Sequence, residues 1–420
     1  MFHRYFTMAD YRDNPKQKQQ ENPLWKVQEL LDELNKQAKD MWLPGKWVAI
    51  DEQTIGFQGA STMKIRISYK REGDGFQCDA VCDRGYTYSF WFRCGNPPIL
   101  PQTFKHHDLS PTAKRVVWLA LRLPNEWTRI YMDNLFNSRK LFAALYQAKA
   151  LAHGVARTSH RGLPNLIIQR EEKNKDRAEK LRGTTMAARL VDCTDCPDLL
   201  AVSTYDTKPV HMLSTAADSV EWIVSKKKVW SEEAHRKAFV KFLRLNVIDE
   251  YNKNMNSTDI ADQLRGVYRP DHWMRNRKWW WAIWIWGIGV AGVNGYRIYE
   301  VMYEEQKCLD KNSVPPRWSH ARFLEELVND FMFPGETSKH LYALQSMDDS
   351  TFASSVKLTR NFSLYGCNAP KIDYDFSCAS GCKEYLKAVK PHRLNKMRLS
   401  NGFFTHRFDG QRHCYIPARA

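Results

Sequence analysis

The sequence predicts a mixed α/β fold, and three features of the chain support this prediction. Strand-like segments between residues 47 and 92 are separated by short turn signals. Helical and strand-like segments then alternate as far as residue 157, which is the order expected of a mixed α/β layer. A second β-rich stretch at 184–248 precedes a mostly helical segment, so we expect a β-rich insertion and helices on the flanks of the sheet.

Composition restricts the class of protein. The length of 420 residues gives a prior of about three domains, and a hydrophobic content of 43% excludes a wholly disordered chain. Lysine and arginine total 63 against 47 aspartates and glutamates, which leaves a net charge of +16 at pH 7. A chain this basic favours a polyanionic partner, nucleic acid before a membrane surface or an acidic protein. Surface charge without a specific partner is the alternative.

The first 46 residues carry an amphipathic helical pattern. Apolar residues recur at spacings of three and four after the helix-start signal Asn22-Pro23; they are Leu24, Val27, Leu30, Leu31 and Leu34. A single helix cannot bury such a face. We therefore expect it to pack on an element later in the chain, or on a domain whose earlier part is absent from this chain.

The first strand is expected at 46–57, where a short apolar run ends at Asp51. Alternating apolar and polar residues then predict strands at 63–69, 77–82 and 86–92. Glycine-containing turn signals at 73–75 and 83–85 separate these segments. The pattern predicts two connected hairpins after the first strand.

Helices and strands alternate beyond a proline-rich break. We predict a helix at 112–121, a strand at 127–132 that ends before Asp133, a helix at 138–149 and a strand at 153–157. The mixed charge run at 169–183 is typical of a solvated helix or linker. Strands return at 184–230, and a further helical segment is expected at 250–271.

An apolar run of 15 residues at 279–293 is a candidate membrane span. A span needs about 20 such residues, so we predict a buried helix and no membrane partner. Glycines at 287, 289, 292 and 295 would permit this helix to pack closely. The ten cysteines are too sparse for a secreted disulfide framework, and the N-terminal sequence does not resemble a signal peptide, so we expect the cytosol or the nucleus.

Three aspartates lie where metal chemistry could use them. Asp51 and Asp133 each close an apolar strand, and Asp259 lies at a helix-start signal. If the two strands are parallel neighbours, their carboxylates share one edge of the sheet, and a helix crossing that edge adds the third. Three carboxylates suit Mg²⁺ or Mn²⁺, which are hard cations that prefer oxygen ligands. Aspartates at strand ends and helix caps are also common for local hydrogen-bonding reasons, and this alternative stays open.

Three motifs resemble those of the piggyBac transposases. Residues 50–59, IDEQTIGFQG, resemble the D-E-Q-x-x-G-F-x-G block of that family, and residues 132–138, MDNLFNS, resemble its D-N-x-F-x-S block. Tyr251 and Asn252, followed by TDIADQ at 258–263, resemble its Y-N…V-D-x-x-D-Q block. The motifs occur in the order of the family, and the resemblance extends from about residue 1 to about residue 310.

This resemblance implies a ribonuclease-H-like catalytic domain with a β-rich insertion, plus a helical dimerisation and DNA-binding domain built from both flanks. Such enzymes cut DNA at inverted-repeat ends, form hairpin intermediates and join the ends to TTAA targets. Asp51, Asp133 and Asp259 match the metal-binding triad, and Asp262 matches an acidic position one helical turn later. The implied partner is double-stranded DNA, the implied assembly is a homodimer, and the implied location is the nucleus.

The resemblance also divides the chain into expected units. These are a remnant of the N-terminal helical domain at 1–46, the catalytic domain at 47–183 and 249–268, the β-rich insertion at 184–248, the second part of the helical domain at 269–362, and a Cys/His-containing segment at 363–420. Family transposases have a longer region before the first catalytic strand. We therefore expect this chain to be N-terminally truncated.

A basic and aromatic stretch, residues 265–281, follows the third aspartate. Arginine forks fit phosphates, and aromatic rings can stack on exposed bases. The residues predicted to contact DNA are Arg265, Arg269, Arg275, Arg277 and Lys278. For the tryptophans at 279–281, a place in the core is the alternative to base stacking. The three lysines at 226–228 are equally consistent with phosphate contacts and with a solvated turn.

The C-terminal segment contains four candidate zinc ligands, Cys367, Cys378, Cys382 and Cys414. Family members often end in a cysteine-rich zinc module, but the spacing here lacks the close pair that is typical of a tetrahedral site. Ordinary core or surface cysteines are therefore the alternative. The C-x-x-C motif at 193–196 is more consistent with a plain loop than with a zinc site.

Two functional hypotheses follow. The first is metal-dependent DNA strand cleavage and transfer by the aspartate triad, which the three aspartates favour. The second is a DNA-binding protein that keeps the transposase fold without effective catalysis, which the short N-terminal region favours.

Overall fold

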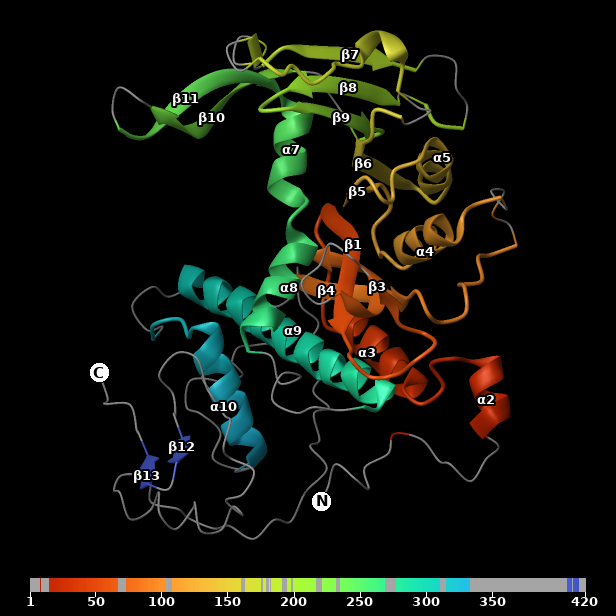
Figure 1. Cartoon of the computed structure of the whole chain (residues 1–420), viewed down its shortest axis with the longest axis vertical. Coiled ribbons are helices and arrows are strands. Elements are labelled where there is room, and N and C mark those ends of the chain that lie inside the picture. The colour runs from red at the N-terminus through yellow and green to blue at the C-terminus, as the bar shows by residue number, and fades with distance from the viewer. Residues whose placement is uncertain are drawn as a thin grey trace.

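The computed structural model describes most of the chain between residues 15 and 332. The described residues are 8, 15–66, 73–102, 104, 108–159, 163–174, 177–178, 181, 183–190, 195–197, 199–216, 221–231, 235–268, 277–309, 315–332, 406–409 and 411–414. Their elements form a large mixed sheet flanked by helices (Figure 1). The mixed α/β class predicted from the sequence is confirmed.

Five strands form the centre of the sheet. In spatial order they are β4 (Tyr86–Phe92), β3 (Asp74–Asp83), β1 (Trp47–Gly56), β5 (Thr128–Met132) and β6 (Ala150–Ala156). Strands β1, β5 and β6 are parallel, whereas β3 is antiparallel to both β1 and β4. This is the order and direction of the strands in a ribonuclease-H-like sheet. The short strand β2 (Ile65–Arg66) pairs with the start of β3.

The turn between β3 and β4 has the backbone that the sequence predicts. Arg84 and Gly85 have positive φ angles of 48° and 84°, as a two-residue hairpin turn requires. The other expected turn, at 73–75, is corrected by the structure, because β3 begins at Asp74. Gly75 lies inside the sheet and permits a close approach of β1: a Cβ there would lie 2.0 Å from the carbonyl oxygen of Ile55.

Helix α5 (Arg139–Gln147) packs against the parallel strand β6, and helix α4 (Pro111–Ala120) packs against α5 and against the antiparallel strands β3 and β4. Each begins after a serine, Ser110 or Ser138, whose hydroxyl oxygen accepts a hydrogen bond from the backbone N–H three residues later. Their apolar residues share a large hydrophobic cluster with β1 and β5; its fully buried members include Val116, Leu141, Phe142, Val48, Ile50 and Ile130. This cluster supports the strands that carry two of the candidate aspartates.

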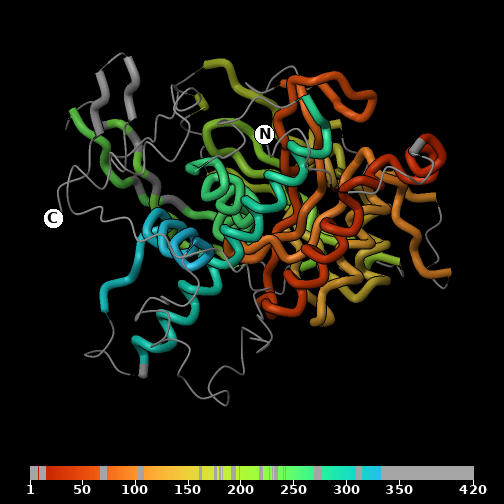
Figure 2. Tube along the Cα trace, turned by 90° about the horizontal axis from the view of Figure 1, so that it is seen from below, coloured from red at the N-terminus to blue at the C-terminus, as the bar shows by residue number. Residues whose placement is uncertain are grey.

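The N-terminal helices α2 (Pro15–Glu21) and α3 (Gln28–Asp40) precede the sheet in sequence. Helix α3 lies beside the long helix α9 (Trp279–Leu309), and both pack on β4 (Figures 1 and 2). Asn294 of α9 accepts a hydrogen bond from the backbone N–H of Thr87 at 2.8 Å and donates one to its carbonyl oxygen at 2.9 Å. The expectation that the early amphipathic helix packs on a later element is confirmed.

The apolar run at 279–293 forms the first half of α9, and its glycines allow close packing. A Cβ on Gly287 would lie 2.8 Å from Leu34 of α3, and a Cβ on Gly295 would lie 3.4 Å from Phe323 of α10 (His320–Met332). Trp280, Trp281 and Trp286 are buried, which confirms the core interpretation of this run. In the part of the chain that the structure describes, no helix is long and apolar enough to span a membrane.

The β-rich segment after residue 183 divides into two parts. Strands β7 (Thr185–Arg189), β8 (Leu200–Tyr205) and β9 (Pro209–Ser214) continue the central sheet, because β9 pairs with β6 in antiparallel orientation. Strands β10 (Trp222–Ser231) and β11 (Arg236–Leu245) form a separate two-stranded ribbon. Much of the expected insertion is therefore continuous with the sheet, and the domain boundaries given above stay predictions. A 3-10 turn (Asn165–Ile167) precedes these strands, and β12 (His406–Asp409) pairs with β13 (Gln411–Cys414).

The helical segment expected at 250–271 is two helices, α7 (Asn246–Asn254) and α8 (Ser257–Val267), with a break at Met255 and Asn256. Helix α7 follows β11 directly and leads down to α8, which packs on β1 and β3 (Figure 1). A separate hydrophobic cluster, which we call the α7 cluster, joins α7 to the sheet; it contains Tyr131, Leu200, Val202, Met212, Val247, Ile248 and Tyr251.

Candidate active site

Asp51 lies in the middle of β1, which corrects the expectation that it closes a strand. Strand β1 continues to Gly56 because its second half pairs with β3. Its pairing with β5, however, stops at the pair formed by Ile50 and Met132. Asp51 is therefore the first residue of β1 that extends past the end of β5, at an edge where the sheet opens.

Asp133 directly follows β5, so it continues the register beside Asp51. The loop after it is held on the neighbouring strand β6. Asn137 Nδ2 donates hydrogen bonds to the carbonyl oxygens of Gly154 at 3.0 Å and Val155 at 2.8 Å. Asn137 was not identified from the sequence as a positioning residue, although its place in the motif at 132–138 was a usable signal.

Asp259 lies exposed in the first turn of α8. Ser257 docks this end of the helix, because its hydroxyl oxygen accepts a hydrogen bond from the backbone N–H of Arg84 at 3.2 Å. Asp262, one turn later, forms an ion pair with Arg265 at 3.2 Å. The Arg265 side chain is only 14% exposed and packs against Gly289 of α9. The structure thus places Arg265 between two helices with an acidic partner.

The neighbouring carboxylates act electrostatically on Asp51. The pKa of Asp51 is raised to about 7, first because burial disfavours its charged form. The negative charges of Glu52, Asp133 and Asp259 raise it further. A hydrogen bond of 2.7 Å from the backbone N–H of Glu52 to Asp51 Oδ1 opposes these effects. The pKa of Tyr251 in α7 is also raised, by burial and then by the same three aspartates. Asp133 and Asp259 therefore both lie within electrostatic range of Asp51 and of Tyr251.

The donor set fits a hard divalent cation in chemistry and in charge. Carboxylate oxygens are the ligands that Mg²⁺ and Mn²⁺ prefer, and a cation would relieve the repulsion that raises the pKa of Asp51. The ligands are not yet gathered around one point: among the described residues, no group of three His, Cys, Asp or Glu side chains is arranged to hold a metal ion. The negative charges that would attract a cation thus lie near Asp51, but the described side chains are not arranged as a set of three metal ligands.

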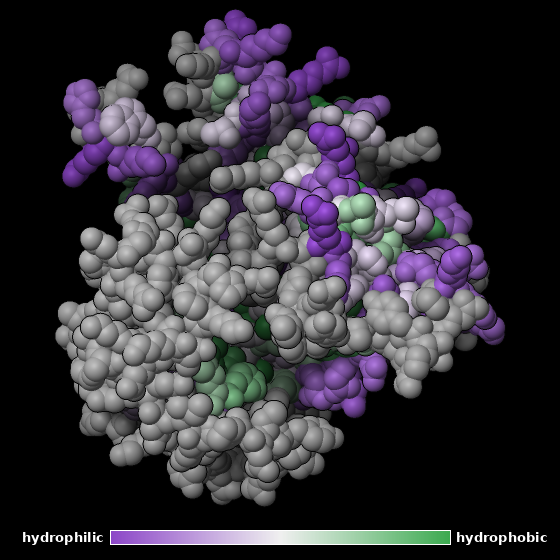
Figure 3. Space-filling model, turned by 60° about the horizontal axis from the view of Figure 1, so that its bottom comes forward, coloured by the Kyte–Doolittle hydropathy of each residue, from purple (hydrophilic) through white to green (hydrophobic). Residues whose placement is uncertain are grey.

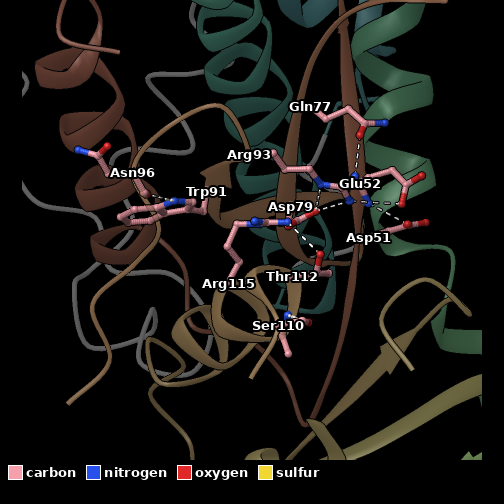
Figure 4. Close-up of polar contacts among 11 residues, drawn as sticks. Asp51, Glu52, Gln77, Asp79, Trp91, Arg93, Asn96, Ser110, Thr112 and Arg115 are labelled. Carbon is pink, nitrogen blue, oxygen red and sulfur yellow. Dashed lines mark hydrogen bonds and ion pairs between the residues drawn. The ribbon is translucent and has the colours of Figure 1, made fainter. Parts of the chain in front are cut away.

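An ion network lies beside this edge of the sheet (Figure 4). Asp79 of β3 is 0% exposed, and both Arg93 and Arg115 donate to its carboxylate; Arg93 Nη2 lies 2.6 Å from Asp79 Oδ1. Arg93 Nη2 also lies 3.7 Å from Glu52 Oε2. Glu52 and Asp79 are opposite each other in the register of β1 and β3, where two like charges would destabilise the sheet without an arginine between them.

Sequence reasoning missed this network. Its members come from β1, β3, the turn after β4 and α4, so no short motif contains them. The available signal was an acidic residue, Asp79, within a strand whose neighbouring residues are suited to burial.

Several predicted site residues have no place in the described structure. Arg269, Arg275, Cys367, Cys378 and Cys382 lie outside the described residues. Cys414 lies in β13, but its side chain is outside the described part. Cys193 also lies outside the described residues, and Cys196 is buried. The zinc site therefore stays a prediction.

Two predicted DNA-contacting residues precede α9. Arg277 is exposed, and Lys278 Nζ lies 5.3 Å from the ring centroid of Trp280. Trp280 itself is buried. Of this pair, Arg277 is thus the exposed side chain, whereas Lys278 is half-buried.

Comparison with solved structures supports the fold. The chain is similar to a piggyBac transposase whose cryo-EM structure shows its synaptic complex with hairpin DNA. The two share 20% sequence identity at a TM-score of 0.59, and the similarity covers 82% of this chain. It covers 63% of the piggyBac chain, so this protein spans less than two thirds of the length of that transposase. At this identity the similarity establishes a common fold.

A comparison with protein families identifies the lineage. Residues 2–296 match the profile of the family described as Transposase IS4. The match covers more than half of the 420 residues and includes β1, β5 and α8 with their aspartates. The chain therefore belongs to the Transposase IS4 family and shares its fold with a piggyBac transposase.

Proposed function

We propose that this protein cleaves and transfers DNA strands at a metal-dependent site formed by Asp51, Asp133 and Asp259. One observation carries the proposal: carboxylates from β1, from the end of β5 and from α8 together raise the pKa of Asp51. Transposases of this family use a divalent metal ion, which we propose to be Mg²⁺ or Mn²⁺ here. The TTAA target and the transposon ends as substrates rest on the resemblance of the motifs.

Two residues of the chain, Asp51 and Tyr251, prepare the site for a cation. A bound divalent cation would activate the attacking oxygen and stabilise the leaving oxygen of the phosphodiester. Because the pKa of Asp51 is about 7, cation binding near neutral pH is coupled to loss of its proton. The Tyr251 hydroxyl donates to the carbonyl oxygen of Met132 at 3.3 Å, which holds α7 at the end of β5 next to Asp133.

We propose double-stranded DNA as the partner, a homodimer as the assembly and the nucleus as the location. The net charge of +16 favours a polyanionic partner. The similar transposase was solved with hairpin DNA, which supports DNA as the substrate class. The dimer and the nuclear location rest on the resemblance to the family.

The test compares nicking with binding. Asp51→Asn, Asp133→Asn and Asp259→Asn keep the side-chain size but remove the charge that holds a cation. Each should reduce the nicking of supercoiled plasmid DNA with Mn²⁺ by about 10²-fold or more, while binding to duplex DNA persists. Asp249→Asn is the matched control, because Asp249 on α7 pairs with Lys253 at 2.7 Å instead of facing the site.

The outcomes separate the two hypotheses. If all three variants nicked DNA as fast as the wild type, the aspartates would have no part in the mechanism. A wild-type protein that binds duplex DNA but does not nick it under any divalent ion would favour the alternative, a DNA-binding protein that keeps the fold without catalysis.

A further inference from the structure

The β10–β11 ribbon has an exposed face that the proposed catalytic site does not use. In the antiparallel register, Lys226 is opposite Lys241, Lys228 is opposite Phe239, and Trp230 is opposite Lys237. Directly opposed residues point to the same side of a two-stranded ribbon, and so do residues two apart along a strand. The outer half of this side, which we call the basic face, contains Lys226, Lys228, Trp230, Lys237, Phe239 and Lys241. The half nearer the base carries the exposed apolar residues Trp222, Val224 and Leu243.

The basic face is accessible and positively charged. All six of its residues are exposed, with Trp230 at 59% and Phe239 at 64%. Neither strand contains an aspartate or a glutamate. Glu232 and Glu233, in the segment that connects the strands, lie outside the described residues.

The pair of Lys226 and Lys241 is unfavourable without a ligand. Two like charges directly opposite each other on one face destabilise a strand pair. No carboxylate among the described side chains forms an ion pair with either lysine. An anion that lies over the face would remove this repulsion, so the arrangement fits a polyanionic ligand.

Protection of a sheet edge does not explain the composition of this face. Lysines can prevent strands from pairing with other chains, but that purpose does not require large exposed aromatic rings among them. Here Lys228 Nζ lies 5.2 Å from the ring centroid of Phe239, and Trp230 is exposed at the outer end of the same face. Ammonium groups for phosphates together with rings for sugars or bases are characteristic of nucleic-acid surfaces.

The ribbon has a fixed place relative to the candidate active site. Its base is closed by a hydrogen bond of 2.9 Å from the Asn246 backbone N–H to the Glu221 carbonyl oxygen. Helix α7 follows β11 directly and leads to α8, which carries Asp259. The ribbon projects from the body at the upper left of Figure 1. In the space-filling view, the residues coloured by hydropathy along the upper edge of the molecule are mostly hydrophilic (Figure 3).

We propose that the basic face of the β10–β11 ribbon is a second DNA-binding surface, which binds duplex DNA at a distance from the aspartates. A two-stranded ribbon fits the major groove of B-form DNA, with its lysines within reach of the phosphates on either side. The proposal takes DNA as the substrate class from the proposed function, but it requires neither a metal ion nor catalysis.

The experiment measures duplex binding as a function of salt. The double variant Lys226→Gln/Lys241→Gln removes two charges from exposed positions. Binding of a labelled random-sequence duplex is followed by fluorescence anisotropy in EDTA, so the catalytic site is not involved. The slope of log K against log salt should be less steep by about 1.8, because each lost phosphate contact contributes about 0.9. The matched control Lys208→Gln/Lys253→Gln removes two lysines that pair with Glu171 and Asp249, and it should keep the wild-type slope.

Each outcome decides the proposal. A duplex affinity and a salt slope equal to those of the wild type would overturn it. A loss of equal size in both double variants would also overturn it, because net charge alone would then explain binding. A wild-type protein that shows the ribbon-dependent slope but never nicks DNA would support the ribbon and contradict the proposed catalysis, so the two proposals fail separately.

Discussion

Asp79 is an acidic side chain inside the sheet, directly opposite a second acid, Glu52. Desolvating a carboxylate is costly, so such a group is stable where charged donors surround it, as Arg93 and Arg115 do here. Glu52 follows Asp51 in β1, and its backbone N–H is bonded to the Asp51 carboxylate. The network therefore fixes the part of β1 that carries the candidate metal ligand.

The importance of this network can be tested at Arg93. Arg93→Met leaves Asp79 with one arginine and leaves Glu52 facing it, so the free energy of unfolding should fall by about 3–5 kcal/mol. Lys149→Met is the control, because the Lys149–Glu126 pair is exposed on both sides and should contribute at most about 1 kcal/mol. Urea unfolding measures both. An Arg93 variant as stable as the Lys149 variant would show that the network does not hold the strand.

Single residues were predictable where their role follows from local sequence. Asp51, Asp133 and Asp259 were chosen as candidates from the elements and motifs around them, and the structure places Asp133 and Asp259 within electrostatic range of Asp51. Their role as metal ligands stays a prediction. The prediction that Asp51 ends its strand was wrong. The length of β1 is set by its pairing with β3 and not by the apolar run before the aspartate. The partners of Asp79 could not be predicted, because they are brought together only by strand pairing and by the packing of α4.

At the scale of elements, local chemistry sets the borders that the sequence predicts well. Helices α4 and α5 begin after their serine caps, and the turn at Arg84 and Gly85 has the expected positive φ angles. Gly75 has a different role from the one predicted. It lies where two strands approach closely, and the turn signal around it could not be distinguished from a sheet position without knowledge of β1.

Two glycine substitutions test this difference. Gly75→Ala places a Cβ against the carbonyl of Ile55, so the strands must separate, and the free energy of unfolding should fall by about 1–3 kcal/mol. Gly266→Ala, within α8, meets nothing within 4 Å and should stabilise the protein by about 0.5–1 kcal/mol, because alanine loses less entropy in a helix. Thermal unfolding followed by circular dichroism shows whether each substitution lowers or raises the stability. Equal effects of the two substitutions would contradict the close approach at Gly75.

At the scale of the molecule, the β-rich segment after residue 183 is joined to the central sheet. The sequence indicated strands there but not their partner, because the choice of β6 as the neighbour of β9 depends on which sheet edge is open. The α7 cluster extends this connection. It includes Tyr131 of β5, Met212 of β9 and Tyr251 of α7, and the pKa of Tyr251 reports the charges of the three aspartates. The core beneath the candidate site is thus built partly by the insertion.

Because this core is shared, we expect the elements around it to unfold together. Met212 is buried between β5, β8 and α7, so Met212→Ala should lower the free energy of unfolding by about 2–5 kcal/mol. Hydrogen exchange should show the loss of protection in β5, β9 and α7 together, because one cluster supports all three elements. Met186→Ala makes the same substitution at an exposed position of β7 and should change protection little. If Met212→Ala lowered protection in β7, β8 and β9 alone, the insertion would fold as an independent unit. The insertion would then position α7 and α8 through the chain connection and not through packing.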